Sequence, residues 1–267
     1  LAVLTATGVS SLTARLLPPD ALSAWGWRVP FGLGAALSLF GVYLRRGLAE
    51  TPAFAAATPA RAGGVGTILR AVAEYPREVF IVFVVQLGGL QYYLWMIFLP
   101  TYATLVGGLD RAQAFAGGIL ASLAYCVGVP LFALASDRIG RKPFLIGSAA
   151  GFLVLTYPML SALAVPNLAF GSYAVVAVAG ALLVAVNNAV LGTVFAELFP
   201  TRVRASGIGI PYAVSGAIFG GTAPAAATWL QSHGGPLFIS LYVGLVCLVT
   251  LATHLTLTPE TRGRALD

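Results

Sequence analysis

The chain has 267 residues, of which 58% are hydrophobic and 9% are charged, and it carries a formal net charge of +6. In a soluble globular protein of this size roughly a quarter of the residues are charged, so the composition predicts an integral membrane protein and excludes a soluble one. The positive charge does not indicate nucleic-acid binding, because the cations lie in short loops and not along an aromatic-interleaved face.

Eight apolar segments follow one another along the chain, and we expect each of them to be a membrane helix. They cover about residues 1–17, 29–44, 79–103, 112–135, 144–165, 168–195, 205–230 and 236–257. The sequence begins at Leu1 inside an apolar segment, without an initiator Met or a basic region followed by a cleavage site, so we expect it to be a fragment.

If the chain crosses the membrane at every segment, its loops fall on alternating sides. Twelve of the 15 Lys and Arg residues then lie on one side, namely Arg45, Arg46, Arg61, Arg70, Arg77, Arg138, Arg141, Lys142, Arg202, Arg204, Arg262 and Arg264. The other side has only Arg15, Arg28 and Arg111. Because short cytoplasmic loops are enriched in Lys and Arg, this distribution predicts a cytoplasmic C-terminus.

The stretch from Ala133 to Pro143, ALASDRIGRKP, is a short charged loop between two long apolar segments. Gly140 permits the left-handed turn that reverses the chain at once. Asp137 lies at the end of a helix, where the helix dipole disfavours an acid, so we expect it to have a cationic partner or a neighbouring helix N-terminus. The charges either fix topology only or take part in gating, and the sequence leaves both open.

The spacing D-R-x-G-R-K between two membrane helices closely resembles the signature loop of the major facilitator superfamily. The matching residues are Asp137, Arg138, Gly140, Arg141 and Lys142. A glycine usually stands four residues before the Asp, and this chain has Ala133 there. The resemblance implies an all-α membrane protein built as a helix bundle, with this loop at the cytoplasmic face.

Further stretches resemble the metabolite:proton symporter family, which includes proline/betaine, ketoglutarate, citrate and shikimate carriers. WGWRVPF at Trp25–Phe31, followed by ETPAF at Glu50–Phe54, is similar to the end of its N-terminal half. ELFPTRVRASG at Glu197–Gly207 is similar to its loop between helices ten and eleven, whereas PETRGR at Pro259–Arg264 is shared with sugar porters. The resemblance implies that the eight segments are helices five to twelve of a twelve-helix carrier.

The resemblance also implies a division of the chain. Residues 1–44 would be the last two helices of the N-terminal six-helix bundle, 45–77 a cytoplasmic central loop, 78–257 the C-terminal six-helix bundle and 258–267 a cytoplasmic tail. Glu197, Arg202 and Arg204 form a second group of acid and bases at the next cytoplasmic turn. We expect this turn to lie close to the signature loop and to form a cytoplasmic gate with it.

In this superfamily the first helix of each three-helix unit lines the central cavity, which implies the segments 79–103 and 168–195. The substrate-path candidates are polar residues in these and neighbouring segments, namely Gln86, Gln91, Tyr92, Tyr93, Tyr125, Asn187, Asn188 and Tyr212. Buried amides in hydrocarbon need partners, so hydrogen bonding between helices is the alternative. Tyr102 and Trp229 lie near segment ends and are expected at the membrane interface.

No acid and no histidine occurs in the middle of the last six segments. Proton coupling needs such a group, so we expect it on the preceding helices. His233 and His254 lie near loops and helix ends, where we expect them to be solvated. Cys126 and Cys247 lie in apolar segments without partner spacing, so we expect no disulfide, no metal site and no cofactor.

These observations predict a secondary active transporter that works by alternating access. The resemblance to the metabolite:proton symporter family implies proton-coupled symport of a small carboxylate or zwitterionic metabolite across the cytoplasmic membrane. The expected partners are the lipid bilayer, the substrate and protons, with no nucleic acid, and the full-length protein is expected to be monomeric. A membrane enzyme is disfavoured, since the chain offers no clustered His, Cys or paired carboxylates near a segment end. A sugar-porter-like facilitator of a neutral solute and a transport-inactive sensor remain as alternatives.

Overall fold

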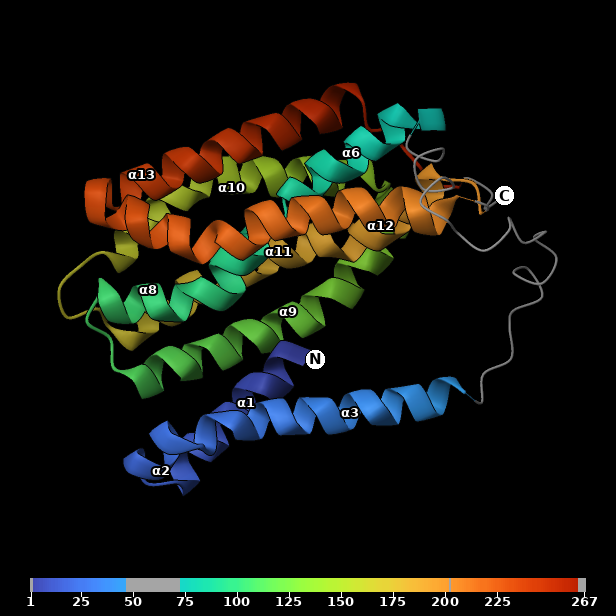
Figure 1. Ribbon diagram of the computed structural model, residues 1–267. Coiled ribbons are helices and arrows are strands. Elements are labelled where there is room, and N and C mark those ends of the chain that lie inside the picture. Colours follow the sequence, from blue (N-terminus) through green and yellow to red (C-terminus); the bar gives the residue numbers. More distant parts are fainter. Residues whose placement is uncertain (1, 47–72, 202, 264–267) are drawn as a thin grey trace. The chain divides into compact units, whose positions relative to one another are not determined.

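The computed structural model describes residues 2–46, 73–201 and 203–263, and every regular element in these ranges is a helix (Figure 1). The chain divides into two compact units, residues 1–59 and 60–267. Most of the predicted central loop and the predicted gate residue Arg202 lie outside the described residues.

The first unit consists of short helical elements. They are α1 (Ala2–Leu16), α2 (Pro19–Ala24), a 3-10 turn η1 (Gly26–Arg28) and α3 (Val29–Arg45). The Arg28 guanidinium lies over the Trp27 ring at 4.3 Å and donates to the Ala24 carbonyl at 2.8 Å, which fixes the turn into α3. None of the residues of α3 is buried within this unit, so its apolar surface is available to lipid or to other parts of the protein.

The second unit is a bundle of long helices, some of them interrupted. Its elements are α6 (Pro76–Leu87), α7 (Leu90–Tyr92), η2 (Tyr93–Phe98), α8 (Leu99–Leu105), α9 (Arg111–Ile139), α10 (Lys142–Leu163), α11 (Phe170–Leu198), α12 (Arg204–Ser215), η3 (Gly216–Gly220) and α13 (Gly221–Thr256). The segments η2 and η3 are π-helical, a wider winding that occurs in short stretches and often at functional sites.

Six helices in the described ranges are long and apolar enough to cross a membrane. They cover Gly26–Arg45, Pro76–Leu105, Arg111–Ile139, Lys142–Leu163, Phe170–Leu198 and Arg204–Thr256. The last of them contains two predicted segments, because the backbone leaves the helical region at Gly235, with φ 61° and ψ −153°, and the chain reverses there (Figure 1). The first predicted segment forms α1, whose 15 residues span only about 22 Å at 1.5 Å per residue.

The bundle is held by broad helix contacts. The most extensive is between α9 and α11, and α10 packs against both α11 and α13, while α6 packs against α12. Close approach of α9 and α11 depends on Gly117, since a Cβ there would collide with the Tyr173 ring. The Tyr173 hydroxyl donates to the Ala114 carbonyl at 3.0 Å, so its polar tip is satisfied inside the bundle.

Tyr102 corrects one expectation from the sequence. It is 1% exposed and its hydroxyl donates to the Leu160 carbonyl of α10 at 3.3 Å, so it is a core residue and not an interface anchor. A position near a helix end does not fix the direction of the side chain, and here the ring points inward. Trp229, by contrast, is 60% exposed, as expected for an interface residue.

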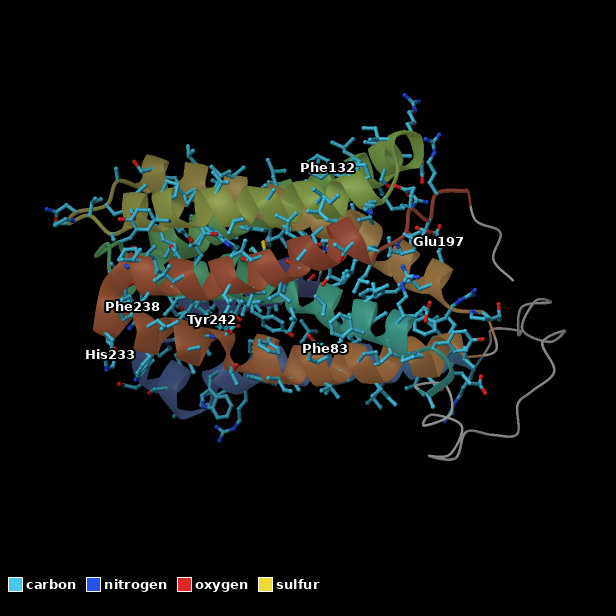
Figure 2. The ribbon with its side chains drawn as sticks, turned by 90° about the horizontal axis from the view of Figure 1, so that it is seen from above. Phe83, Phe132, Glu197, His233, Phe238 and Tyr242 are labelled. Atoms are coloured by element: carbon cyan, nitrogen blue, oxygen red, sulfur yellow. The ribbon has the colours of Figure 1, made fainter. Side chains whose placement is uncertain are left out.

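The two ends of the second unit differ in charge. Seven Lys and Arg residues are described in it, and six of them belong to one end: Arg77, Arg138, Arg141, Lys142, Arg204 and Arg262. The opposite end has Arg111. Figure 2 shows Glu197 at the first end and His233 at the other. We call the first one the charged end.

Candidate functional site

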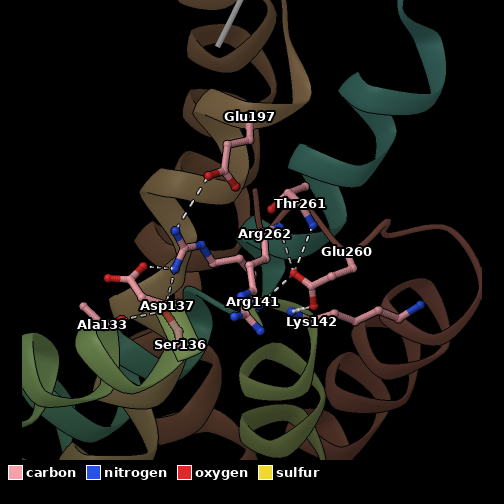
Figure 3. Close-up of polar contacts among 9 residues, drawn as sticks. All are labelled: Ala133, Ser136, Asp137, Arg141, Lys142, Glu197, Glu260, Thr261 and Arg262. Atoms are coloured by element: carbon pink, nitrogen blue, oxygen red, sulfur yellow. Dashed lines mark hydrogen bonds and ion pairs between the residues drawn. The ribbon is translucent and has the colours of Figure 1, made fainter. Parts of the chain in front are cut away.

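The signature loop and the chain tail meet at the charged end (Figure 3). Asp137 comes from the last turn of α9, Arg141 and Lys142 from the start of α10, Glu197 from the last turn of α11 and Glu260 from the tail after α13. We call these five residues the charged cluster. It connects three parts of the chain that are far apart in sequence: the signature loop, the end of α11 and the tail.

Gly140 makes the sharp turn between α9 and α10 possible. Its φ is 116°, a value that residues with a side chain rarely adopt. A Cβ at this position would also lie only 2.6 Å from the Glu260 Oε2 atom. The predicted turn is confirmed, and the structure adds a second reason for glycine, which is the approach of the tail carboxylate.

Arg141 is the central residue of the charged cluster. Its Nη1 atom donates to Asp137 Oδ1 at 2.5 Å and to Ser136 Oγ at 2.9 Å, and its Nη2 atom lies 3.7 Å from Glu197 Oε1. The side chains of Arg141 and Glu197 are only 13% and 10% exposed, whereas that of Asp137 is 59% exposed. The expected cationic partner of Asp137 is therefore confirmed, and it comes from the same loop.

The contact between Arg141 and Glu197 also confirms that the two predicted loops lie close together. Arg204, which the sequence grouped with Glu197, binds elsewhere: its Nε atom donates to the Phe199 carbonyl of its own loop at 3.2 Å. Among the described residues, Glu197 Oε2 and Arg141 Nε have no hydrogen-bond partner although both atoms are buried. The Glu197 carboxylate can therefore accept, and the Arg141 guanidinium donate, one further hydrogen bond to another partner.

Glu260 is a member of the charged cluster that the sequence analysis missed. Its Oε1 atom accepts the backbone N–H groups of Arg141 at 2.9 Å and of Thr261 and Arg262 at 3.0 Å each. Its Oε2 atom accepts the Lys142 N–H at 3.1 Å. The carboxylate thus covers the N-terminus of α10, where the helix dipole favours an anion.

These contacts also set the acidity of Glu260. Partial burial raises the pKa of its carboxyl, but the N–H groups of Arg141, Arg262, Lys142 and Thr261 outweigh this effect, so its pKa lies below the usual value. The C-terminus of α13 is stabilised in the complementary way by cations. Lys142 Nζ donates to the Leu255 carbonyl at 3.2 Å, and Arg77 donates to the Leu257 carbonyl at 2.9 Å.

A second cluster of polar side chains lies inside the bundle, in the middle parts of its helices. Asn188 donates to the Tyr125 hydroxyl at 3.0 Å, and Asn187 donates to the Asn188 amide oxygen at 3.4 Å. The Tyr92 ring lies 6.0 Å from the Tyr125 ring and 5.9 Å from the Tyr93 ring, measured between centroids. We call these five residues the tyrosine–asparagine cluster, and it joins α7, η2, α9 and α11.

The other path candidates lie around this cluster in different environments. Gln86 and Gln91 are 6% and 4% exposed, and the amide oxygens of both lack a partner among the described residues. Gln91 Nε2 donates to Cys247 Sγ of α13 at 3.3 Å, so this side chain points into the bundle. Tyr212 is 45% exposed, with its ring against Phe195 at 6.3 Å.

The two histidines differ from what the sequence suggested. His233 is exposed and stacks on Trp229 at 4.3 Å, in line with a solvated position. His254 is only 2% exposed, so the expectation of a solvated residue is wrong. It lies in the last turn of α13, but the face that carries it packs against α10. Its distance from the helix end gave no signal of this burial.

The comparison with known protein families bears on both groups of residues. The model of the family described as "Sugar (and other) transporter" matches residues 58–267. The chain belongs to this family of the major facilitator superfamily. The family confirms the all-α membrane bundle, indicates a transporter and not an enzyme, and places the chain among multi-pass membrane proteins with a small-molecule substrate.

Individual relatives agree with this assignment. An "Alpha-ketoglutarate permease" of Escherichia coli (strain K12) is 32% identical over 92% of this chain and 56% of its own length. A "Glycine betaine/proline/ectoine/pipecolic acid transporter OusA" of Dickeya dadantii (strain 3937) is 31% identical over 97% of this chain and 53% of its own length. The chain thus spans about half the length of the curated relatives it matches. No solved structure matches the chain.

Proposed function

We propose that the chain forms part of a secondary active transporter that moves a small organic metabolite, a carboxylate or a zwitterion, together with protons across the cytoplasmic membrane. The observation that carries this proposal is the charged cluster, in which one arginine joins two loops and one tail carboxylate joins α10 to the end of α13. The printed names of the relatives, a ketoglutarate permease and a betaine and proline transporter, support this substrate class.

The charged cluster is proposed to be a cytoplasmic gate. The proposed gate also includes neighbouring residues, so that its members are Asp137, Arg138, Gly140, Arg141, Lys142, Glu197, Arg202 and Arg204, with Glu260 added from the structure. Alternating access requires contacts that exist in one state and break in another, so that their free energy selects between states. The ion pair of Asp137, whose side chain is 59% exposed, suits this role, because water replaces the lost partner at small cost.

The same positive charge supports the proposed topology. Six of the seven described cations of the second unit belong to the charged end, and short loops with excess Lys and Arg remain in the cytoplasm. The charged end and the C-terminus are therefore proposed to face the cytoplasm, as is a division into an N-terminal pair of helices, a central loop and a C-terminal bundle.

The tyrosine–asparagine cluster with Gln86, Gln91 and Tyr212 is proposed to line the substrate path. These groups are neutral donors and acceptors, which orient a substrate but do not offset the charge of a buried carboxylate. Charge recognition and the proton-binding group are therefore proposed to lie on helices that precede this chain. The functional unit is proposed to be a monomer of the full-length protein.

Uptake into proteoliposomes tests the proposal. The full-length protein is reconstituted, a proton gradient is imposed, and uptake of labelled ketoglutarate, proline and glycine betaine is measured with and without a protonophore. We expect accumulation of at least one compound that the protonophore abolishes, and no uptake by residues 1–267 alone. Equilibration without accumulation would instead favour a facilitator of a neutral solute, and binding without uptake a sensor.

A further inference from the structure

A small cavity lies inside the second unit, between the start of α7 and helices α10, α11 and α13. It offers about 10 Å³ to the centre of a water molecule, which is about the room that a single water needs. Its polar lining comes from six residues on these four helices: Gln91, Ser148, Asn187, Cys247, Thr250 and His254. Charged side chains are absent from this lining.

The lining of the cavity is rich in hydrogen-bond acceptors. Ser148 Oγ donates its hydrogen to the Leu183 carbonyl at 2.9 Å, and Thr250 Oγ1 lies 3.0 Å from the carbonyls of Val246 and Cys247. Both hydroxyl hydrogens are thus directed to helix backbone, and the oxygens keep lone pairs for another donor. The side chains of Ser148 and Thr250 are each 3% exposed, so bulk water does not supply that donor.

Gln91 supplies the acceptor that most requires a partner. Its Nε2 atom donates to Cys247 Sγ at 3.3 Å, and its Oε1 atom is buried without a partner in the described part of the chain. An amide oxygen buried in this way is costly, so native structures usually provide a protein group or an ordered water. The residue is 4% exposed and borders the cavity.

His254 adds a further acceptor. Its Nδ1 atom is 3.3 Å from Thr258 Oγ1, and this hydroxyl donates to the Thr253 carbonyl at 3.3 Å. With its hydrogen used there, Thr258 accepts from Nδ1–H, which assigns the proton to Nδ1 and leaves Nε2 as an acceptor. The ring is 2% exposed, and burial of this kind disfavours a charged imidazole.

We propose that this cavity binds one water molecule, which donates to Gln91 Oε1 and to one of the other acceptors and accepts from the Asn187 amide. A metal cation fits poorly, because the described lining has no carboxylate to offset its charge and the Lys142 ammonium lies 3.2 Å from the carbonyl of Leu255, the residue after His254. Water is neutral and provides the two donated hydrogens that the lining lacks.

The bound water has a structural consequence for the tyrosine–asparagine cluster. Gln91 directly precedes Tyr92 and Tyr93, just after the interruption at Gly88 and Gly89 between α6 and α7. The Gly88 and Gly89 N–H groups donate to the Val85 and Gln86 carbonyls at 3.0 and 2.8 Å, a tighter winding than in an α-helix, and α7 continues directly into η2. The water connects Gln91 to α10, α11 and α13 and holds this short segment in place.

Radiolytic hydroxyl-radical labelling tests the proposal on the full-length protein in lipid nanodiscs. Radicals form from the water next to a side chain, so a buried residue is labelled only if water is bound beside it. Cys247, 2% exposed, borders the cavity, and Met96, 7% exposed, does not, which makes Met96 an internal control. We expect labelling of Cys247 at a rate several-fold above that of Met96.

Two variants identify the residues that hold the water. Gln91→Met keeps the volume and removes the amide oxygen, and Thr250→Val keeps the shape and removes the hydroxyl. We expect a several-fold loss of Cys247 labelling in Gln91→Met and a smaller loss in Thr250→Val, which also serves if the first variant does not fold. Labelling of Cys247 at the Met96 rate in the unaltered protein, or equal labelling in all variants, would overturn the proposal.

Discussion

The charged end and the interior of the second unit differ in how their polar side chains are hydrogen-bonded. At the charged end, Glu260 and Asp137 are satisfied by backbone N–H groups and by Arg141. In the interior, Gln86 and Gln91 keep unpartnered amide oxygens within the described chain. Contacts near water can break and re-form at small cost, whereas a buried amide needs a partner in every state.

This difference suggests that the two regions have different roles in transport. At the charged end, the contacts of the exposed carboxylates Asp137 and Glu260 are able to switch between states, while Glu197 Oε2 and Arg141 Nε lack a partner among the described residues. The interior has open polar capacity, which is available to a substrate, to water or to parts of the protein outside this chain.

Arg141→Met removes the residue that joins the two loops. It leaves Glu197, whose side chain is 10% exposed, without its cation, and we expect a loss of about 1.5–3 kcal/mol in stability, the usual worth of a hydrogen bond to a charged group. Uptake should be abolished. Thermal unfolding and uptake are measured beside Arg138→Met, an exposed cation of the same loop. Equal effects of the two variants would refute the central role of Arg141.

Asp137→Asn should impair transport while membrane insertion stays normal, because the neighbouring cations suffice for topology. The carboxylate is 59% exposed, so the expected loss of stability is small. Asp110→Asn is the matched control at the opposite end of α9, where the carboxylate accepts the Ala112 N–H at 2.9 Å and Asn caps equally well. Transport by Asp137→Asn at the unaltered rate would show that the loop only fixes topology.

The interior is tested by thiol accessibility in a background without Cys126 and Cys247. Asn188→Cys should react with a membrane-impermeant thiol reagent and be protected by substrate, because Asn188 is half-buried and faces Tyr125. Asn187→Cys should react more slowly, since Asn187 is 8% exposed. If neither position reacts in any state, these amides serve hydrogen bonding between helices and not the substrate path.

Much of the fold could be predicted from the sequence, because membrane helices depend on local composition. The segment bounds, the reversal at Gly140 and the need of Asp137 for a cation all follow from residues close in sequence. The hairpin inside Arg204–Thr256 was also predicted as two segments, since Gly234 and Gly235 separate two apolar stretches.

Contacts between distant segments could not be predicted in this way. Glu260 binds the backbone of Arg141, 119 residues earlier, and backbone N–H groups leave no mark in a sequence. Tyr102 and His254 are buried because of the direction in which their side chains point, which distance from a helix end does not determine. The tail has two acids, Glu260 and Asp267, beside Arg262 and Arg264, and its composition does not distinguish Glu260.

Glu260→Gln should have the smallest effect and the most specific pH dependence. The substitution keeps an acceptor oxygen but removes the charge at the N-terminus of α10, which is worth about 0.3–1 kcal/mol at an exposed helix end. The pKa of Glu260 is lower in the folded state, so its stabilising contribution is complete above the unfolded value of about 4.3. It is lost as the pH falls through the lower folded value.

We therefore expect the unfolding temperature of the unaltered protein to exceed that of Glu260→Gln at neutral pH, and the difference to shrink in acid below the unfolded pKa and to disappear below the lower folded pKa. Glu78→Gln is the control, because Glu78 also lies in the first turn of a helix, α6, but accepts no hydrogen bond among the described residues. If Glu78→Gln lowers the unfolding temperature by the same amount, the helix dipole alone accounts for the effect of Glu260→Gln. A difference for Glu260 that persists in acid would mean that the carboxyl acts through packing and not through its charge.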